Sequence, residues 1–110
     1  MELIAKQVIL EAVRALAPVL RKIQKRDREL HEQMRSALSS AVLNLAEGAA
    51  LRDGNRRLRY GTAAGSAKEA RDGLELAVAY EYVAPGEIAT GDALLDRFGA
   101  LTWRLRYPKR

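Results

Sequence analysis

The sequence predicts an all-α fold, an antiparallel up-down-up-down four-helix bundle, on three observations. Apolar residues recur at steps of three and four residues in four successive segments, which is the period of an amphipathic helix. Short turn clusters separate the segments, and helices joined by short loops pack antiparallel to their neighbours. No long stretch alternates polar and apolar residues as a strand does. We expect a single domain over residues 1–110, with helices over about 2–24, 28–51, 56–83 and 86–106.

The first segment carries an apolar stripe and an internal proline. Pro18 lacks a backbone donor, and its ring clashes with the carbonyl group of Arg14, so we expect a kink or a short break there. The stripe consists of Ile4, Val8, Ala12, Leu16, Leu20 and Ile23.

The second segment starts after Asp27, whose side chain is well suited to cap a helix N-terminus. We expect it to stop near Leu51, because the turn-forming residues 52–55 follow. Gly48 lies late in this helix and is predicted to be a position of close packing. The apolar stripe, which is close to a heptad seam, consists of Leu30, Met34, Ala37 or Leu38, Ala41 and Leu45.

The third segment is predicted to begin with Asn55 as its cap and to run to about Val83. Three glycines, Gly61, Gly65 and Gly73, interrupt it. Each costs about 1 kcal/mol of helix propensity relative to alanine, so we predict that another backbone approaches this helix closely. Its stripe of mostly small residues consists of Tyr60, Ala63, Ala67, Ala70, Leu74 and Ala77.

The fourth segment follows the Pro85-Gly86 pair, which separates it from the third. Its tail is basic, and we expect the helix to fray after Arg106. The apolar face consists of Ile88, Leu94, Leu95, Phe98, Leu101 and Leu105.

The net charge of +5 is unevenly distributed. The stretch 66–96 contains seven acids and two bases and carries −5, so the remainder carries +10. A polyanion such as nucleic acid is a natural partner for so basic a surface. Two other interpretations are a charged surface that serves solubility, and acidic and basic faces that attract each other between subunits.

The bases concentrate at the predicted turns. One group, at the first turn, consists of Arg21, Lys22, Lys25, Arg26 and Arg28. A second group surrounds the second turn, and the topology brings the C-terminal tail to the same end. We predict that these eight bases form a nucleic-acid-binding face: Arg52, Arg56, Arg57, Arg59, Arg104, Arg106, Lys109 and Arg110.

The residue types exclude several classes of site. The chain has no cysteine, which excludes disulfides, thiolate metal sites and cysteine nucleophiles. A lone histidine, His31, cannot form a usual zinc site, and we expect it on the solvated surface. We expect no catalytic residue, no metal and no cofactor. No apolar run reaches the roughly 18 residues of a membrane span, so we expect no membrane partner and a cytoplasmic location.

Polar residues share one face on each of the two central helices. Ser40, Asn44 and Glu47 are spaced four and three apart, and Ser66 and Glu69 are three apart beside a glycine. We predict a structural hydrogen-bonded network that fixes the register of two helices or of a subunit contact. The alternative is a catalytic carboxylate flanked by hydroxyl and amide groups, although no base, nucleophile or metal ligand completes such a site.

The same segments resemble a known family. Residues 40–48, SAVLNLAEG, resemble the Ser-Ile-x-x-Asn-Ile-Ala-Glu-Gly signature of the 23S rRNA intervening-sequence proteins, and Arg52 follows as that family's arginine does. Residues 65–69, GSAKE, are similar to its Gly-Ser-x-x-Glu element. Two departures are Ala41 in place of the usual isoleucine, and Arg59-Tyr60 in place of an aromatic and an aliphatic residue.

The resemblance implies a four-helix bundle that assembles as a homopentameric ring. It also relates the chain to the accessory protein of diversity-generating retroelements, a basic pentamer that binds nucleic acid and the reverse transcriptase. Nucleic acid, either RNA or DNA, and a protein such as a reverse transcriptase are therefore expected partners, alongside further copies of this chain.

The charge and the resemblance together favour a non-enzymatic, oligomeric scaffold that binds nucleic acid through its phosphates. The alternative is a structural or protein-interaction module without affinity for nucleic acid. A third hypothesis, an enzyme acting through Glu47 or Glu69, requires a polar cleft around that carboxylate.

Overall fold

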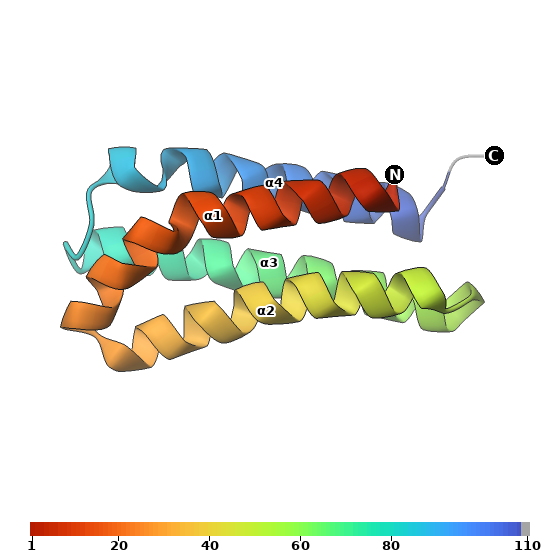
Figure 1. Cartoon of the computed structure of the whole chain (residues 1–110), viewed down its shortest axis with the longest axis horizontal. Helices are drawn as coiled ribbons and strands as arrows, with labels where there is room; N and C mark the ends of the chain where they lie inside the picture. Colours follow the sequence, from red (N-terminus) through yellow and green to blue (C-terminus); the bar gives the residue numbers. More distant parts are fainter. Residues whose placement is uncertain (109–110) are drawn as a thin grey trace.

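The computed structural model describes residues 1–108, and these form four helices without a strand. They are α1 (Glu2–Arg26), α2 (Arg28–Ala50), α3 (Asp53–Ala79) and α4 (Pro85–Arg106). Each helix runs antiparallel to the next, and α1 and α3 each pack against both α2 and α4 (Figure 1). The α2–α3 turn, the start of α1 and the end of α4 lie together at one end of a bundle 45 Å long. The predicted antiparallel four-helix bundle is confirmed.

Helix α1 is continuous through Pro18, so the short break is absent, although the helix bends in its second half (Figure 1). Pro18 and Arg14 are both exposed, so the proline lies on the solvent side of the helix, where a bend is tolerated. Ile4 was predicted to be buried and is instead 44% exposed. The buried residues follow a narrow seam with alternating steps of four and three residues, and Ile4 lies beside it. The buried seam includes Ala5, Ile9, Ala12, Leu16, Val19 and Ile23.

Asp27 joins two turns at the same end of the bundle. Its Oδ1 accepts a hydrogen bond from the backbone N–H of Leu30 at 3.0 Å, which confirms the predicted cap of α2. Its Oδ2 accepts a hydrogen bond from the Tyr82 hydroxyl at 2.9 Å, and this bond raises the pKa of Tyr82. One carboxylate therefore fixes both the start of α2 and the α3–α4 turn.

Helix α3 differs from its predicted bounds at both ends. It begins at Asp53 rather than after Asn55, and it ends at Ala79 rather than near Val83. Glu81 has a left-handed φ of 63°, and its N–H bonds to the carbonyl of Val78. The N–H of Tyr82 bonds to the carbonyl of Ala77 at 2.9 Å. These two bonds form a Schellman motif, which ends the helix.

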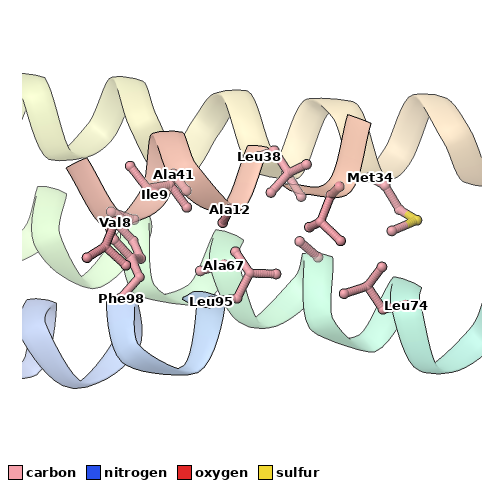
Figure 2. Packing of buried hydrophobic residues seen from close by; sticks show 14 of the residues in the cluster. Val8, Ile9, Ala12, Met34, Leu38, Ala41, Ala67, Leu74, Leu95 and Phe98 are labelled. Carbon is pink, nitrogen blue, oxygen red and sulfur yellow. The ribbon is translucent and has the colours of Figure 1, made fainter. Parts of the chain in front are cut away.

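The core is a column of aliphatic side chains with alanines on α3. Ile9 of α1, Leu38 of α2 and Leu95 and Phe98 of α4 point into it (Figure 2). Full burial of each large side chain contributes about 1.5–3 kcal/mol to stability. The predicted α3 stripe is confirmed, since every member is at most 2% exposed: Tyr60, Ala63, Ala67, Ala70, Leu74 and Ala77.

The glycines have different neighbours. The predicted close packing of Gly48 is confirmed, because a Cβ there would lie 2.7 Å from the Tyr60 ring. Gly73 faces the Met34 side chain, and Gly61 faces the Arg106 guanidinium group. Gly65 has no atom within 4 Å of its Cβ position, so the close backbone approach predicted there is wrong. The helices approach the glycines through side chains rather than through backbone.

Candidate nucleic-acid interface

The predicted basic residues of the second turn and of α4 lie at the same end of the bundle (Figure 1). Arg52 lies in the α2–α3 turn, three more arginines lie in the first two turns of α3, and the last turn of α4 carries two more. Lys109 and Arg110 lie outside the described residues. We call this set the basic end: Arg52, Arg56, Arg57, Arg59, Arg104 and Arg106.

Arg56 is engaged by the end of α2. Its Nε donates to the carbonyl groups of Leu51 at 2.8 Å and Gly48 at 3.2 Å, and its Nη2 donates to that of Ala49 at 3.2 Å. Its Nη1 lies 3.8 Å from a carboxylate oxygen of Glu2. These carbonyl groups lie at the end of α2, where helical N–H partners run out and only that of Gly48 also accepts from the Leu51 N–H, so Arg56 acts as a C-terminal cap. Its first role is therefore structural.

Arg59 and Arg106 are also engaged within the fold. Arg59 pairs with Glu47 at 3.1 Å and donates to the Asn44 side-chain oxygen at 3.2 Å. The Arg106 guanidinium packs against Gly61 and lies 5.0 Å from the centre of the Tyr107 ring. Both charges are thus held against α2 or α3.

Arg52, Arg57 and Arg104 differ from Arg56 and Arg59, which have hydrogen-bond partners, and from Arg106, which is half-buried and whose buried Nε has no hydrogen-bond partner among the described residues. All three are exposed, and none forms a side-chain ion pair or hydrogen bond with another residue within 1–108. A guanidinium group without an internal partner is available to an external phosphate, which it can bind through two parallel hydrogen bonds. These three residues are the strongest candidates for phosphate contact.

The opposite end, around the α1–α2 and α3–α4 turns, is closer to neutral. Lys22 pairs with Glu87, and this bond, together with one from the Ala84 N–H, lowers the pKa of Glu87. Arg26 lies 5.4 Å from the centre of the Tyr82 ring. Five bases lie there together with four acids, Asp27, Glu29, Glu81 and Glu87. At the basic end, six arginines lie together with only three acids, Glu2, Glu47 and Asp53.

The polar network forms in part. The Ser40 and Ser66 hydroxyl groups are 2.8 Å apart and connect α2 to α3. The Asn44 amide donates to the carbonyl and hydroxyl oxygens of Ser40 at 2.9 and 3.0 Å. Glu47 joins only through Arg59, while Glu69 forms no hydrogen bond to this network among the described residues. Asn44 is therefore the link between the interhelical serine pair and the basic end.

Within the acidic stretch, Arg71 bridges α3 and α4. It binds Asp92 at 2.9 Å and Asp96 at 2.9 Å, and the hydrogen bond that it donates to Asp92 is the main cause of its raised pKa. Ion pairs between Arg71 and two aspartates thus connect α3 to α4 on this side of the bundle.

The His31 side chain is largely buried, whereas the sequence predicted it on the solvated surface. Its side chain is only 12% exposed, so the expected solvated position is wrong. It lines an apolar groove between α1 and α2 of about 500 Å³, together with Arg21, Arg35 and Leu43. The ring lies in this groove and is therefore largely shielded from water.

Tyr60 connects the core to the basic end. It is fully buried, and its hydroxyl donates to the Glu2 carboxylate, which also faces Arg56. Burial and the bond to Glu2 raise the pKa of Tyr60 well above its ordinary value. Tyr60 lines a cavity of about 710 Å³ with Trp103 and Tyr107. The spacing of Trp103 and Tyr107, four residues apart beside arginines, is the sequence signal that points to this cavity.

Two findings concern other classes of site. Within residues 1–108, no group of three or more histidine, cysteine, aspartate or glutamate side chains is arranged to hold a metal ion. None of the described helices has the length and apolar character required to cross a lipid bilayer.

The fold has a solved structural neighbour. It is similar to a protein of unknown function from the S23 ribosomal protein family of Bacteroides thetaiotaomicron, with a TM-score of 0.81 and 19% sequence identity. The alignment covers 94% of this chain and 98% of that chain. No protein-family model matches the sequence, and no curated protein matches it. At this identity, the shared property is the four-helix fold.

Proposed function

We propose that this protein is a non-catalytic, oligomeric scaffold that binds nucleic acid through the phosphates at its basic end. The observation that carries the proposal is the grouping of three exposed arginines that have no ion-pair or hydrogen-bond partner within residues 1–108, Arg52, Arg57 and Arg104. Phosphate contacts of this kind give affinity with little dependence on sequence. The fold neighbour's ribosomal family name and the resemblance of residues 40–48 to rRNA intervening-sequence proteins favour RNA as the partner.

The proposed oligomer is a homopentamer, as the family resemblance implies. The apolar groove between α1 and α2 supports self-association, because Leu43 on its rim is 62% exposed. Clustered exposed apolar groups mark interaction surfaces more often than isolated ones. A reverse transcriptase, the protein partner of the retroelement relatives, is a further proposed partner.

The alternative function is a structural or protein-interaction module without affinity for nucleic acid. The same apolar groove favours it, since a groove of this kind serves a protein contact whether or not the basic end binds phosphate.

Fluorescence polarisation with labelled RNA and DNA tests the binding proposal. We expect binding at low salt, with the logarithm of the affinity falling linearly with the logarithm of the salt concentration. An absence of binding to any RNA or DNA at low salt contradicts the proposal and favours the alternative.

Light scattering tests the oligomer. We expect a mass five times that of the 12.2 kDa chain for the wild type, and a lower mass for Leu43→Glu. Leu58→Glu is the matched control, because Leu58 is equally exposed and lies outside the groove. A monomeric wild type, or an equal loss of mass in both variants, contradicts the assignment of this groove.

A further inference from the structure

The cavity at the basic end combines aromatic rings with charged groups. Its volume of about 710 Å³ falls within the range of small-ligand sites, and three of its lining residues are aromatic. Its lining includes Glu2, Arg56, Tyr60, Trp103, Arg104 and Tyr107. The cavity thus opens beside one of the three arginines without an internal partner.

Two aromatic rings at the cavity are accessible from outside. Trp103 is 60% exposed and Tyr107 is 49% exposed, although both are large and largely apolar. Their ring centres are 4.6 Å apart with a tilt of 55°, so they do not cover each other's faces as parallel rings do. The Arg106 guanidinium lies over one face of Tyr107, 5.0 Å from the ring centre, so that face is already occupied. A flat partner can stack on Trp103 and on the exposed part of Tyr107 that Arg106 leaves open.

The charged residues of the cavity determine where the neutral and the anionic parts of a ligand can bind. Glu2 accepts a hydrogen bond from Tyr60 and faces Arg56 at 3.8 Å, so a carboxylate and its counter-charge are already present inside the cavity. A phosphate entering there meets the repulsion of Glu2, whereas a neutral ring does not. Arg104, which is exposed, is the cationic group left for a phosphate. The cavity therefore fits a neutral planar group attached to an anionic backbone.

We infer that this cavity binds an unstacked base of single-stranded nucleic acid. The base stacks on Trp103 and Tyr107, and a phosphate of the same strand contacts Arg104. Duplexes keep their bases stacked internally, so they contact only the arginines. The inference rests on the proposed function and adds a preference for single strands.

The single tryptophan of the chain makes the test direct, because its emission reports only on position 103. The wild-type protein is titrated with a single-stranded oligonucleotide, a duplex of equal phosphate count, and inorganic polyphosphate. We expect strong quenching of Trp103 by the single strand, weak quenching by the duplex and none by polyphosphate.

A variant series separates stacking from charge. Trp103→Leu is expected to weaken single-strand binding about 5- to 150-fold, measured by polarisation of a labelled strand, with little effect on duplex binding. Leu76→Ala is the matched control, since Leu76 is an exposed apolar residue outside both the cavity and the basic end, and it should change neither affinity. Arg104→Gln should weaken binding to both forms.

The outcomes distinguish this inference from the proposed function. Equal affinity for single strand and duplex, with unchanged Trp103 emission and no effect of Trp103→Leu, overturns the base site and leaves phosphate binding intact. An absence of binding to every nucleic acid overturns the proposed function and the base site together.

Discussion

At the residue scale, Tyr60 stands out because a buried hydroxyl connects the core to a charged end. The ring packs against Gly48, and the hydroxyl donates to Glu2, which faces Arg56. Arg56 in turn caps α2. Tyr60 thus links the packing of α3 against α2 to the positions of the Glu2 and Arg56 charges.

Tyr60 predicts a dependence of stability on alkaline pH. Its pKa is raised in the folded protein above the ordinary value of about 10, so its contribution to stability is complete below pH 10. Above that pH the unfolded chain loses the proton first, and the contribution falls. Urea denaturation at a series of alkaline pH values should show a steeper loss of stability for the wild type than for Tyr60→Phe. Identical slopes for the two proteins contradict the role of this hydroxyl.

Alanine substitutions at two glycines, Gly48 and Gly65, are predicted to change the free energy of unfolding in opposite directions. Gly48→Ala places a Cβ 2.7 Å from the buried Tyr60 ring, and we expect a net loss of about 1–2 kcal/mol in the free energy of unfolding. Gly65→Ala meets no atom within 4 Å, and we expect a gain of about 0.5–1 kcal/mol from helix propensity. Urea denaturation measures both, and a loss of stability in Gly65→Ala contradicts the open space at that position.

Several residue-level predictions from the sequence are confirmed, and the exceptions share a cause. Asp27 as a cap and Gly48 as a close contact depend on local chemistry, which the sequence contains. The burial of His31, the exposure of Ile4 and the engagement of Arg56 depend on how neighbouring helices are rotated. Periodicity gives the face of a helix to within about one residue, so it cannot place residues at the edge of the buried stripe.

At the element scale, the helix ends were harder to predict than the helices. The apolar pattern continues to Val83, which favoured a longer α3. The helix ends earlier through a left-handed residue, and that position is usually occupied by glycine. Glu81 stands there instead, so the sequence carried no signal for the stop.

Replacing Glu81 should therefore stabilise the α3–α4 turn. A left-handed φ of 63° costs a residue with a side chain about 1 kcal/mol, so Glu81→Gly is expected to raise the free energy of unfolding by about that amount. Glu81→Ala removes the same charge and keeps the strained backbone, which makes it the matched control. Thermal or urea unfolding gives the comparison. If alanine and glycine stabilise the protein equally, the gain comes from the lost charge near the helix C-terminus and not from the backbone.

At the scale of the whole molecule, the topology decides which charges act together. The up-down order, which the sequence predicted, brings the α2–α3 turn and the end of α4 to one end of the bundle. The eight-residue set predicted there divides in the structure: Arg56 and Arg59 have hydrogen-bond partners, Arg106 is half-buried against Gly61 and Tyr107, three arginines are exposed without ion-pair or hydrogen-bond partners within residues 1–108, and two residues lie outside the described range. Sequence alone could not make this division, because ion pairs and caps depend on tertiary contacts.

The central claim is that the basic end, and not net charge alone, binds nucleic acid. Its most direct test is the salt dependence of single-strand affinity for two triple variants with the same change in charge. One variant replaces Arg52, Arg57 and Arg104 with glutamine, and the other replaces with glutamine three exposed bases of the opposite end that lie outside the α1–α2 groove, Lys25, Arg26 and Arg28. The slope of log affinity against log salt is negative. We predict that the first variant makes it less steep by about 2, as expected for three lost phosphate contacts, and that the second leaves it close to that of the wild type. Equal losses of slope and affinity in the two variants would contradict a binding face at the basic end.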